Sequence, residues 1–197
     1  MSSTSERSLA VAGVRHAAAV LVDAACDVCA ACAAGARLHC TRPLVEGRQL
    51  TAPMPRVVAE EMLEAVTAVA ALVEAPRVGT VVVAAPADSS LAVLVRAVSP
   101  SRVLFAADLR DEALRADLGR LEPSGRARVV VAAGDVRAAV RAVRRGGHVC
   151  VGGSVLHAPS VTELVQREVS LVAPLDAAAV LGRVSTQVWS AAVAAAA

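Results

Sequence analysis

The chain has 197 residues, of which 56% are hydrophobic and 19% charged, with a formal net charge of +2. This length suits one domain with a small additional lobe, and this composition excludes a disordered chain. No stretch of 18 residues lacks a charged side chain, and the net charge is small, so we expect neither a membrane span nor nucleic acid binding. Arg15 and His16 interrupt the first apolar run, which argues against a secretory signal and predicts a cytoplasmic protein.

The use of individual residue types is strongly biased. All 20 basic residues counted as Lys or Arg are arginines, and Ile, Asn and Tyr are absent as well. The codons of these four missing residues are AT-rich, so the bias indicates a very GC-rich genome, such as that of an actinobacterium. The aromatic residues are Phe105 and Trp189 alone, which excludes platforms for stacking bases or sugars.

A polar start and an alanine-rich stretch over residues 1–19 precede a cluster of cysteines with the spacing C-x2-C-x2-C-x7-C: Cys26, Cys29, Cys32 and Cys40. Four thiolates at such spacing make a closed, structural Zn²⁺ site, and Gly35 lies in the long spacer where the chain folds back. Two disulfides and an iron–sulfur cluster are the alternatives, but a reducing compartment and this spacing favour zinc. A fifth cysteine, Cys150, lies in an apolar run and is interpreted as a buried small hydrophobe.

The segment Thr41–Pro55, rich in Pro and Gly, is predicted to be a linker that ends an N-terminal part, 1–55. Residues 56–197 then alternate between helical and strand patterns. We expect helices around Val58–Val73, Leu91–Val98, Asp111–Leu118 (ended by Gly119), Asp135–Arg145 (followed by Gly146 and Gly147), Val161–Arg167 and Asp176–Ala197. Ser89 and Ser90 are candidate caps of the second helix. Strands are expected at Thr80–Ala85, Arg102–Ala107, Arg128–Ala133, His148–Val151 and Val169–Ala173.

Continuous valine runs separated by helices are typical of a parallel sheet covered on both faces. The fold class predicted for residues 56–197 is therefore α/β with a Rossmann-like parallel sheet. A small four-cysteine zinc lobe is predicted to precede it.

This order of segments resembles the zinc-containing medium-chain dehydrogenase/reductase family, the alcohol and polyol dehydrogenases. The cysteine spacing is that of the family's structural-zinc lobe, which makes the N-terminal part a remnant of a GroES-like domain. Four further segments resemble its coenzyme half, in the right order: Val78–Val83, Arg102–Glu112, Ala142–Gly153 and Leu164–Leu171. The resemblance implies the Rossmann-like fold and the four-cysteine zinc site.

The chain departs from the family where the chemistry lies, and we expect it to be a truncated, divergent relative. Most of the catalytic domain ahead of the cysteines is missing, and no His-Glu pair for a catalytic zinc occurs. Glu64 matches a glutamate near that metal in polyol-type members, but a solvated glutamate on a helix is the simpler interpretation. Instead of G-x-G-x-x-G, the chain has Ala85-Pro86-Ala87-Asp88-Ser89-Ser90, which argues against NAD(P) binding because Cβ atoms and a negative charge crowd the phosphate site.

Two functional hypotheses follow. The first is a repurposed or accessory protein of secondary metabolism that binds another enzyme or a small ligand. The second is an NAD(P)-dependent oxidoreductase with atypical coenzyme binding through Ser89, Ser90 and Asp108, the last being placed where a ribose-binding acid belongs. His157, in the loop 154–160 with Ser154 and Ser160, is the best candidate for acid–base work, against the simpler interpretation of a solvated loop histidine.

The remaining expectations concern the other histidines and the surfaces open to partners. His16 is expected to be exposed, His39 to be at most a spare ligand beside Cys40, and His148 to have a structural place in its strand. The last strand, Val169–Ala173, is expected to leave a sheet edge. The apolar C-terminal helix is expected either to cover that edge or to bind a partner, so a homo- or hetero-oligomer through either surface is predicted.

Overall fold

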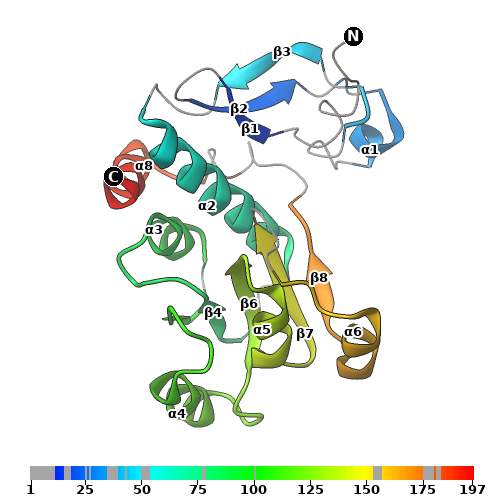
Figure 1. Ribbon diagram of the computed structural model, residues 1–197, viewed down its shortest axis with the longest axis vertical. Coiled ribbons are helices and arrows are strands. Elements are labelled where there is room, and N and C mark those ends of the chain that lie inside the picture. Colours follow the sequence, from blue (N-terminus) through cyan, green and yellow to red (C-terminus); the bar gives the residue numbers. More distant parts are fainter. Residues whose placement is uncertain are drawn as a thin grey trace.

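The structure of the chain is a computed structural model with two β-sheets and their surrounding helices (Figure 1). It describes residues 12–15, 19–24, 26, 28–34, 40–42, 44–49, 54–76, 79–99, 101–152, 157–174, 180 and 183–197. Several residues of the sequence analysis lie outside these ranges: His16, Gly35, His39, Val78 and Ser154. No helix within the ranges combines the length and apolar character needed to cross a membrane.

The N-terminal sheet is antiparallel, runs in the order β1-β2-β3, and is built from Ala12–Arg15, Ala19–Ala24 and Leu44–Gln49. The prediction of a linker over Thr41–Pro55 is therefore wrong at β3, and β1 was not expected within the start of the chain. The sequence of β3, LVEGRQ, has no clean alternation of apolar and polar residues. Pairing with β2, rather than local propensity, makes this segment a strand.

Helix α2, Arg56–Glu74, connects the two sheets and confirms the predicted apolar period, with Val58, Met62, Val66 and Val69 buried. It contacts β1 and β2 on one side and β6 and β7 on the other. An added Cβ on Gly152 of β7 would lie 2.3 Å from the backbone nitrogen of Ala68. A glycine there lets the helix backbone lie directly on the strand.

The second sheet is parallel and has the order β5-β4-β6-β7-β8. Its strands are β4 Val81–Val83, β5 Val103–Phe105, β6 Ala127–Ala133, β7 Val143–Gly152 and β8 Ser170–Val172. The chain goes from β4 to β5 on one side and then returns to β6 on the other, so the strand order reverses around β4. In open α/β sheets, ligands bind at the carboxyl ends of the strands beside such a reversal.

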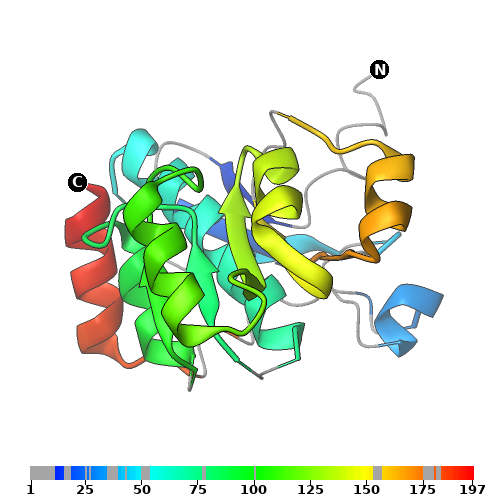
Figure 2. The same cartoon turned by 90° about the horizontal axis from the view of Figure 1, so that it is seen from below.

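Helices cover both faces of this sheet, as the valine runs predict (Figure 2). Val81, Val83, Val129 and Val131 face a core shared with α2, α3 and α8, whereas Val82 and Val130 face a core shared with α4 and α5. The helices are α3 Ser90–Val98, α4 Glu112–Leu121, α5 Val136–Ala142, α6 Val161–Arg167 and α8 Thr186–Ala196. The Rossmann-like α/β prediction is confirmed.

Two predicted helix ends are wrong. Gly119 does not end α4, because the helix continues to Leu121. The next residue, Glu122, is fixed at the end of the helix by its buried carboxylate, which accepts the backbone N–H of Thr80 at 2.8 Å. Helix α5 ends at Ala142 rather than at Arg145, and Arg144 to Gly147 belong to β7. Arginines from outside the helix, Arg126 and Arg167, donate to its last carbonyls and so end it early.

The C-terminal helix α8 is shorter than the predicted 176–197 and begins after Ser185, whose hydroxyl oxygen accepts the backbone N–H of Val188. It packs against α2 and α3 through Ala192 and Ala196. Figures 1 and 2 place it on the opposite side of the molecule from β8. Within the chain, α8 therefore does not cover the edge of the sheet at β8.

Candidate functional site

The four cysteines of the N-terminal part come together around a short helix, α1, Ala30–Ala33. Cys29 is the N-cap residue of α1 and Cys32 lies within it, while Cys26 and Cys40 approach from the chain on either side. All four sulfur atoms lie within 4.8 Å of one another. Elsewhere in the described ranges, no other group of three His, Cys, Asp or Glu side chains is arranged to hold a metal ion.

The distances between the sulfur atoms fit a tetrahedral metal site. The Sγ atoms of Cys26 and Cys32 lie 4.0 Å apart, those of Cys29 and Cys40 3.9 Å, and those of Cys26 and Cys40 3.6 Å. Four sulfurs at about 2.3 Å from a central Zn²⁺ are separated by about 3.8 Å. A disulfide would require about 2.05 Å. The donor set and its geometry therefore fit zinc, and four thiolates leave no position for a substrate.

Backbone hydrogen bonds favour the thiolate form that a metal needs. The backbone N–H of Cys32, followed by that of Thr41, lowers the pKa of the Cys29 thiol to about 5. The pKa of Cys26 is also lowered, chiefly by the backbone N–H of Val28. Donation of an N–H to sulfur stabilises its negative charge. Cys150, in contrast, is fully buried in β7, and burial raises its pKa to about 12, which confirms it as a small core residue.

The second candidate region is the loop at the carboxyl end of β4, where a Rossmann-type protein would hold phosphate. Ser89 caps α3, as predicted: its hydroxyl oxygen accepts the N–H of Ala92 at 3.2 Å and its hydroxyl donates to the carbonyl of Pro86 at 2.7 Å. Arg96 donates to the carbonyl of Ala87 at 2.7 Å and lies over the ring of Phe105. These hydrogen bonds within the loop fix its conformation. The Ser89 oxygen also accepts one of the backbone N–H groups that have no partner within the first turn of α3.

The other predicted cofactor residues lie in different surroundings. Ser90 is buried, and its hydroxyl donates to the Oε1 atom of Glu61 on α2 at 2.8 Å. Asp88 is exposed at the start of α3. Asp108 is exposed just after β5, where one of its carboxylate oxygens accepts the backbone N–H of Arg110 at 2.8 Å. Ser89 and Asp108 therefore lie at the carboxyl edge of the sheet, whereas the Ser90 hydroxyl is turned into the core.

The candidate acid–base residues lie on different elements of the fold. Glu64 is exposed on α2, as the solvated interpretation expects. His157 is exposed, and its backbone carbonyl accepts the N–H of Arg137 at 3.0 Å in the first turn of α5. Ser160 caps α6, where its hydroxyl oxygen accepts the N–H of Glu163. His148 lies half-buried in β7 opposite Val129 and Ser170, a structural place.

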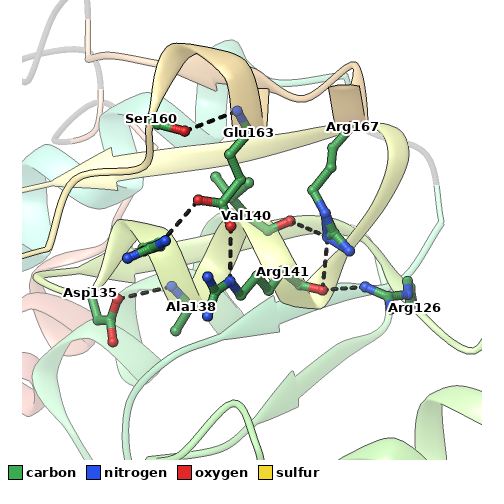
Figure 3. Close-up of polar contacts among 9 residues, drawn as sticks. Arg126, Asp135, Ala138, Val140, Arg141, Ser160, Glu163 and Arg167 are labelled. Carbon is green, nitrogen blue, oxygen red and sulfur yellow. Dashed lines mark hydrogen bonds and ion pairs between the residues drawn. The ribbon is translucent and has the colours of Figure 1, made fainter. Parts of the chain in front are cut away.

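A polar network that was not expected from the sequence joins α5 and α6 (Figure 3). Glu163 receives the guanidinium groups of Arg137 at 3.1 Å and Arg141 at 2.8 Å. Arg167 donates to the carbonyls of Val140 and Arg141. The spacing of Arg137 and Arg141, four residues apart on one helix face, is the signal that could have predicted a shared acidic partner.

Comparisons with known proteins support the fold. No protein-family model and no curated protein matches the chain. Solved structures do match, among them an NAD-dependent alcohol dehydrogenase with 16% identity, a TM-score of 0.50, and coverage of 83% of this chain and 63% of that one. An alcohol dehydrogenase from Aeropyrum pernix has 15% identity, a TM-score of 0.51, and coverage of 88% and 66%.

A further match is an acetophenone reductase from Geotrichum candidum, solved in complex with NAD, with 14% identity, a TM-score of 0.50, and coverage of 89% of this chain and 64% of that one. The chain thus spans somewhat less than two thirds of the length of these proteins. The chain therefore has the fold of the zinc-type alcohol dehydrogenases, the family that its cysteine spacing and its coenzyme-half segments resemble.

Proposed function

We propose that the chain is an accessory or repurposed protein with an alcohol-dehydrogenase fold, which does not oxidise alcohols by itself. In this proposal it works in the secondary metabolism of a GC-rich bacterium, in the cytoplasm. The observation that carries the proposal is that the loop after β4, residues 85–90, is fixed by its own hydrogen bonds. The hydroxyl oxygen of Ser89 caps α3, Arg96 donates to the Ala87 carbonyl, and the hydroxyl of the buried Ser90 donates to the partly buried Glu61 of α2.

The chemistry of dinucleotide binding explains why this loop matters. A pyrophosphate needs glycines that let the backbone approach and free N–H groups at a helix N-terminus. In this loop a serine oxygen already accepts one of those N–H groups, and Asp88 is exposed beside it with a negative charge. Binding of pyrophosphate would require the serine cap to open and the anion to lie beside a carboxylate, and both requirements disfavour it.

The proposed metal is a structural Zn²⁺ held by Cys26, Cys29, Cys32 and Cys40. The metal would cross-link the segments of the chain on either side of α1. Its role would be structural, because a closed shell of four thiolates leaves no coordination position for a substrate or water. We also propose that a catalytic zinc is missing. The support is that the sequence contains no His-Glu pair of the kind that the family uses to hold that metal.

The proposal is tested by titrating the purified chain with NADH and NADPH while following fluorescence and melting temperature. We expect no saturable binding below about 1 mM. Micromolar binding accompanied by a rise in melting temperature would contradict the proposal, because a ligand that binds the folded state stabilises it.

The second candidate function, an NAD(P)-dependent oxidoreductase, is favoured by one observation. Asp108 is exposed at the carboxyl end of β5, where a ribose-binding carboxylate would lie. If this candidate is right, coenzyme binding will occur in the same titration and Asp108→Ala will weaken it by about tenfold or more. Asp88→Ala is the matched control, since it removes a carboxylate of the loop rather than one that binds ribose, and it should leave binding intact or improve it.

A further inference from the structure

A groove on the α4–α5 face of the molecule gathers positive charge. It has a volume of about 420 Å³ and is lined by four arginines, Arg110, Arg115, Arg126 and Arg141. They come from four separate segments: the loop after β5, helix α4, the loop before β6, and helix α5. The fold therefore brings these arginines together from segments that are separate in the sequence.

No carboxylate lines this groove to balance the arginines. Arg141 has an acidic partner, Glu163, but that residue belongs to α6, outside the lining. Arg126 donates to the carbonyl of Arg141. In the described part of the chain, neither Arg110 nor Arg115 forms an ion pair. The groove thus has positive charge that no carboxylate of its lining balances, and a bound anion would balance it.

The shape and the remaining lining define the class of ligand. The volume is within the range of small-molecule sites. The floor between the arginines is apolar and is formed by Leu109 and Leu118 with small alanines of α5, so it suits a compact carbon body. No aromatic side chain lines the groove, which removes the usual platform for a stacked base. The planar fork of arginine matches the oxygens of phosphate groups in pairs.

We propose that the α4–α5 groove binds a small molecule that carries two or more negative charges as phosphate groups. The groove lies on the face of the sheet that α4 and α5 cover, whereas the loop after β4 leads into α3 on the other face. The groove is therefore separate from the loop after β4, on which the function proposed above depends, although Arg110 lies two residues after Asp108, the residue of the second candidate function. Arg115 and Arg126 hold the phosphate oxygens, and Arg110 adds positive charge to the same lining.

The probe for the test is inorganic pyrophosphate, titrated calorimetrically into the chain in about 150 mM NaCl, where unspecific surface attraction is largely screened. We expect saturable binding of one pyrophosphate with a Kd of about 1 mM or below. Arg115→Gln should weaken binding by about tenfold, because a charge-assisted bond is lost. Arg102→Gln, which removes an exposed arginine outside the groove, is the matched control and should leave the Kd within about twofold.

Three results would overturn the proposal. The first is the absence of saturation, and the second is an equal loss of affinity in Arg115→Gln and Arg102→Gln, which would indicate attraction by net charge alone. The third is tighter binding of citrate than of pyrophosphate, which would reassign the groove to polycarboxylates. Circular dichroism of both variants verifies that the total helical content is unchanged, so that a loss of affinity reports on the groove.

Discussion

At the scale of single residues, two glycines of this chain have opposite roles. Gly152 of β7 lies against the backbone of α2, and an added Cβ would come within 2.3 Å of the Ala68 nitrogen. Gly119 lies within α4, and an added Cβ would have nothing within 4 Å. The sequence alone does not distinguish these two glycines. The packing of α2 on the sheet determines that a residue without a side chain is needed at position 152.

These surroundings predict opposite effects of the same substitution. Gly152→Ala should lower the free energy of unfolding by about 1–3 kcal/mol or more, because the strand or α2 must move to admit the methyl group. Gly119→Ala should raise it by about 0.5–1 kcal/mol, because alanine loses less backbone entropy in a helix. Urea unfolding followed by circular dichroism measures both. A neutral Gly152→Ala would show that α2 does not lie on β7 at this distance.

The same scale explains what could be predicted of the candidate site. The cysteine cluster follows from spacing, because thiolates two residues apart turn toward one cation on a short helix such as α1. The role of Ser89 as a cap also follows from its position before an apolar helix. The burial of Ser90 against Glu61 could not be predicted, because it depends on how α2 and α3 pack.

At the scale of elements, α6 is joined to α5 by charged contacts beside one apolar contact, the packing of the partly buried Leu164 against the core that α5 shares. Helix α6 has no buried residue, and two of its valines, Val161 and Val165, are 76% and 69% exposed. Its attachment to α5 depends on Glu163, which receives Arg137 and Arg141, and on Arg167, which donates to the end of α5. The guanidinium of Arg141, and then that of Arg137, keeps the pKa of Glu163 below its ordinary value.

This contact predicts a pH dependence of stability with a definite sign. A carboxylate whose pKa is lower in the folded than in the unfolded state stabilises the fold above its unfolded pKa of about 4.3. The stabilisation disappears as the pH falls through the lower, folded pKa. Glu163→Gln should therefore be less stable than the parent chain at pH 7, and the difference should shrink below pH of about 4.

Melting temperatures measured between about pH 7 and pH 3 test this prediction, since the window covers the ordinary carboxylate range. Glu64→Gln is the control, because it removes an exposed carboxylate of α2. A constant difference between Glu163→Gln and the parent chain across this window would contradict the ion-pair interpretation.

At the scale of the whole molecule, the two sheets differ in how far their sequences define them. Val81–Val83 is buried on both faces, so a continuous valine run predicts the central strand and the parallel fold with it. Two of the N-terminal strands carry no such run: β1 reads AGVR and β3 reads LVEGRQ. Strand β3 forms by pairing with β2, which is distant in the sequence, with Gln49 opposite Leu21 and Leu44 opposite Ala24, and local patterns do not encode such pairing.

This difference predicts that the proposed zinc stabilises only one part of the molecule. The strands β4 to β8 and their helices have two apolar cores of their own, and neither includes a cysteine of the cluster. Among the residues before α2 that the structure describes, the regular elements are the three-stranded sheet and the short helix α1, which carries Cys32 of the cluster. Removing the metal should therefore unfold the region of the cluster and leave the parallel sheet folded.

The measurement is metal analysis of protein purified without chelator, combined with circular dichroism before and after chelation. We expect about one zinc per chain, its loss in Cys40→Ser, and retention of most of the helical signal, because α2 to α8 lie outside the cluster. Cys150→Ser is the matched control: it changes a thiol buried in β7 and should keep the zinc. Less than about half an equivalent of zinc in the parent chain, with no change in Cys40→Ser, would refute the four-thiolate site.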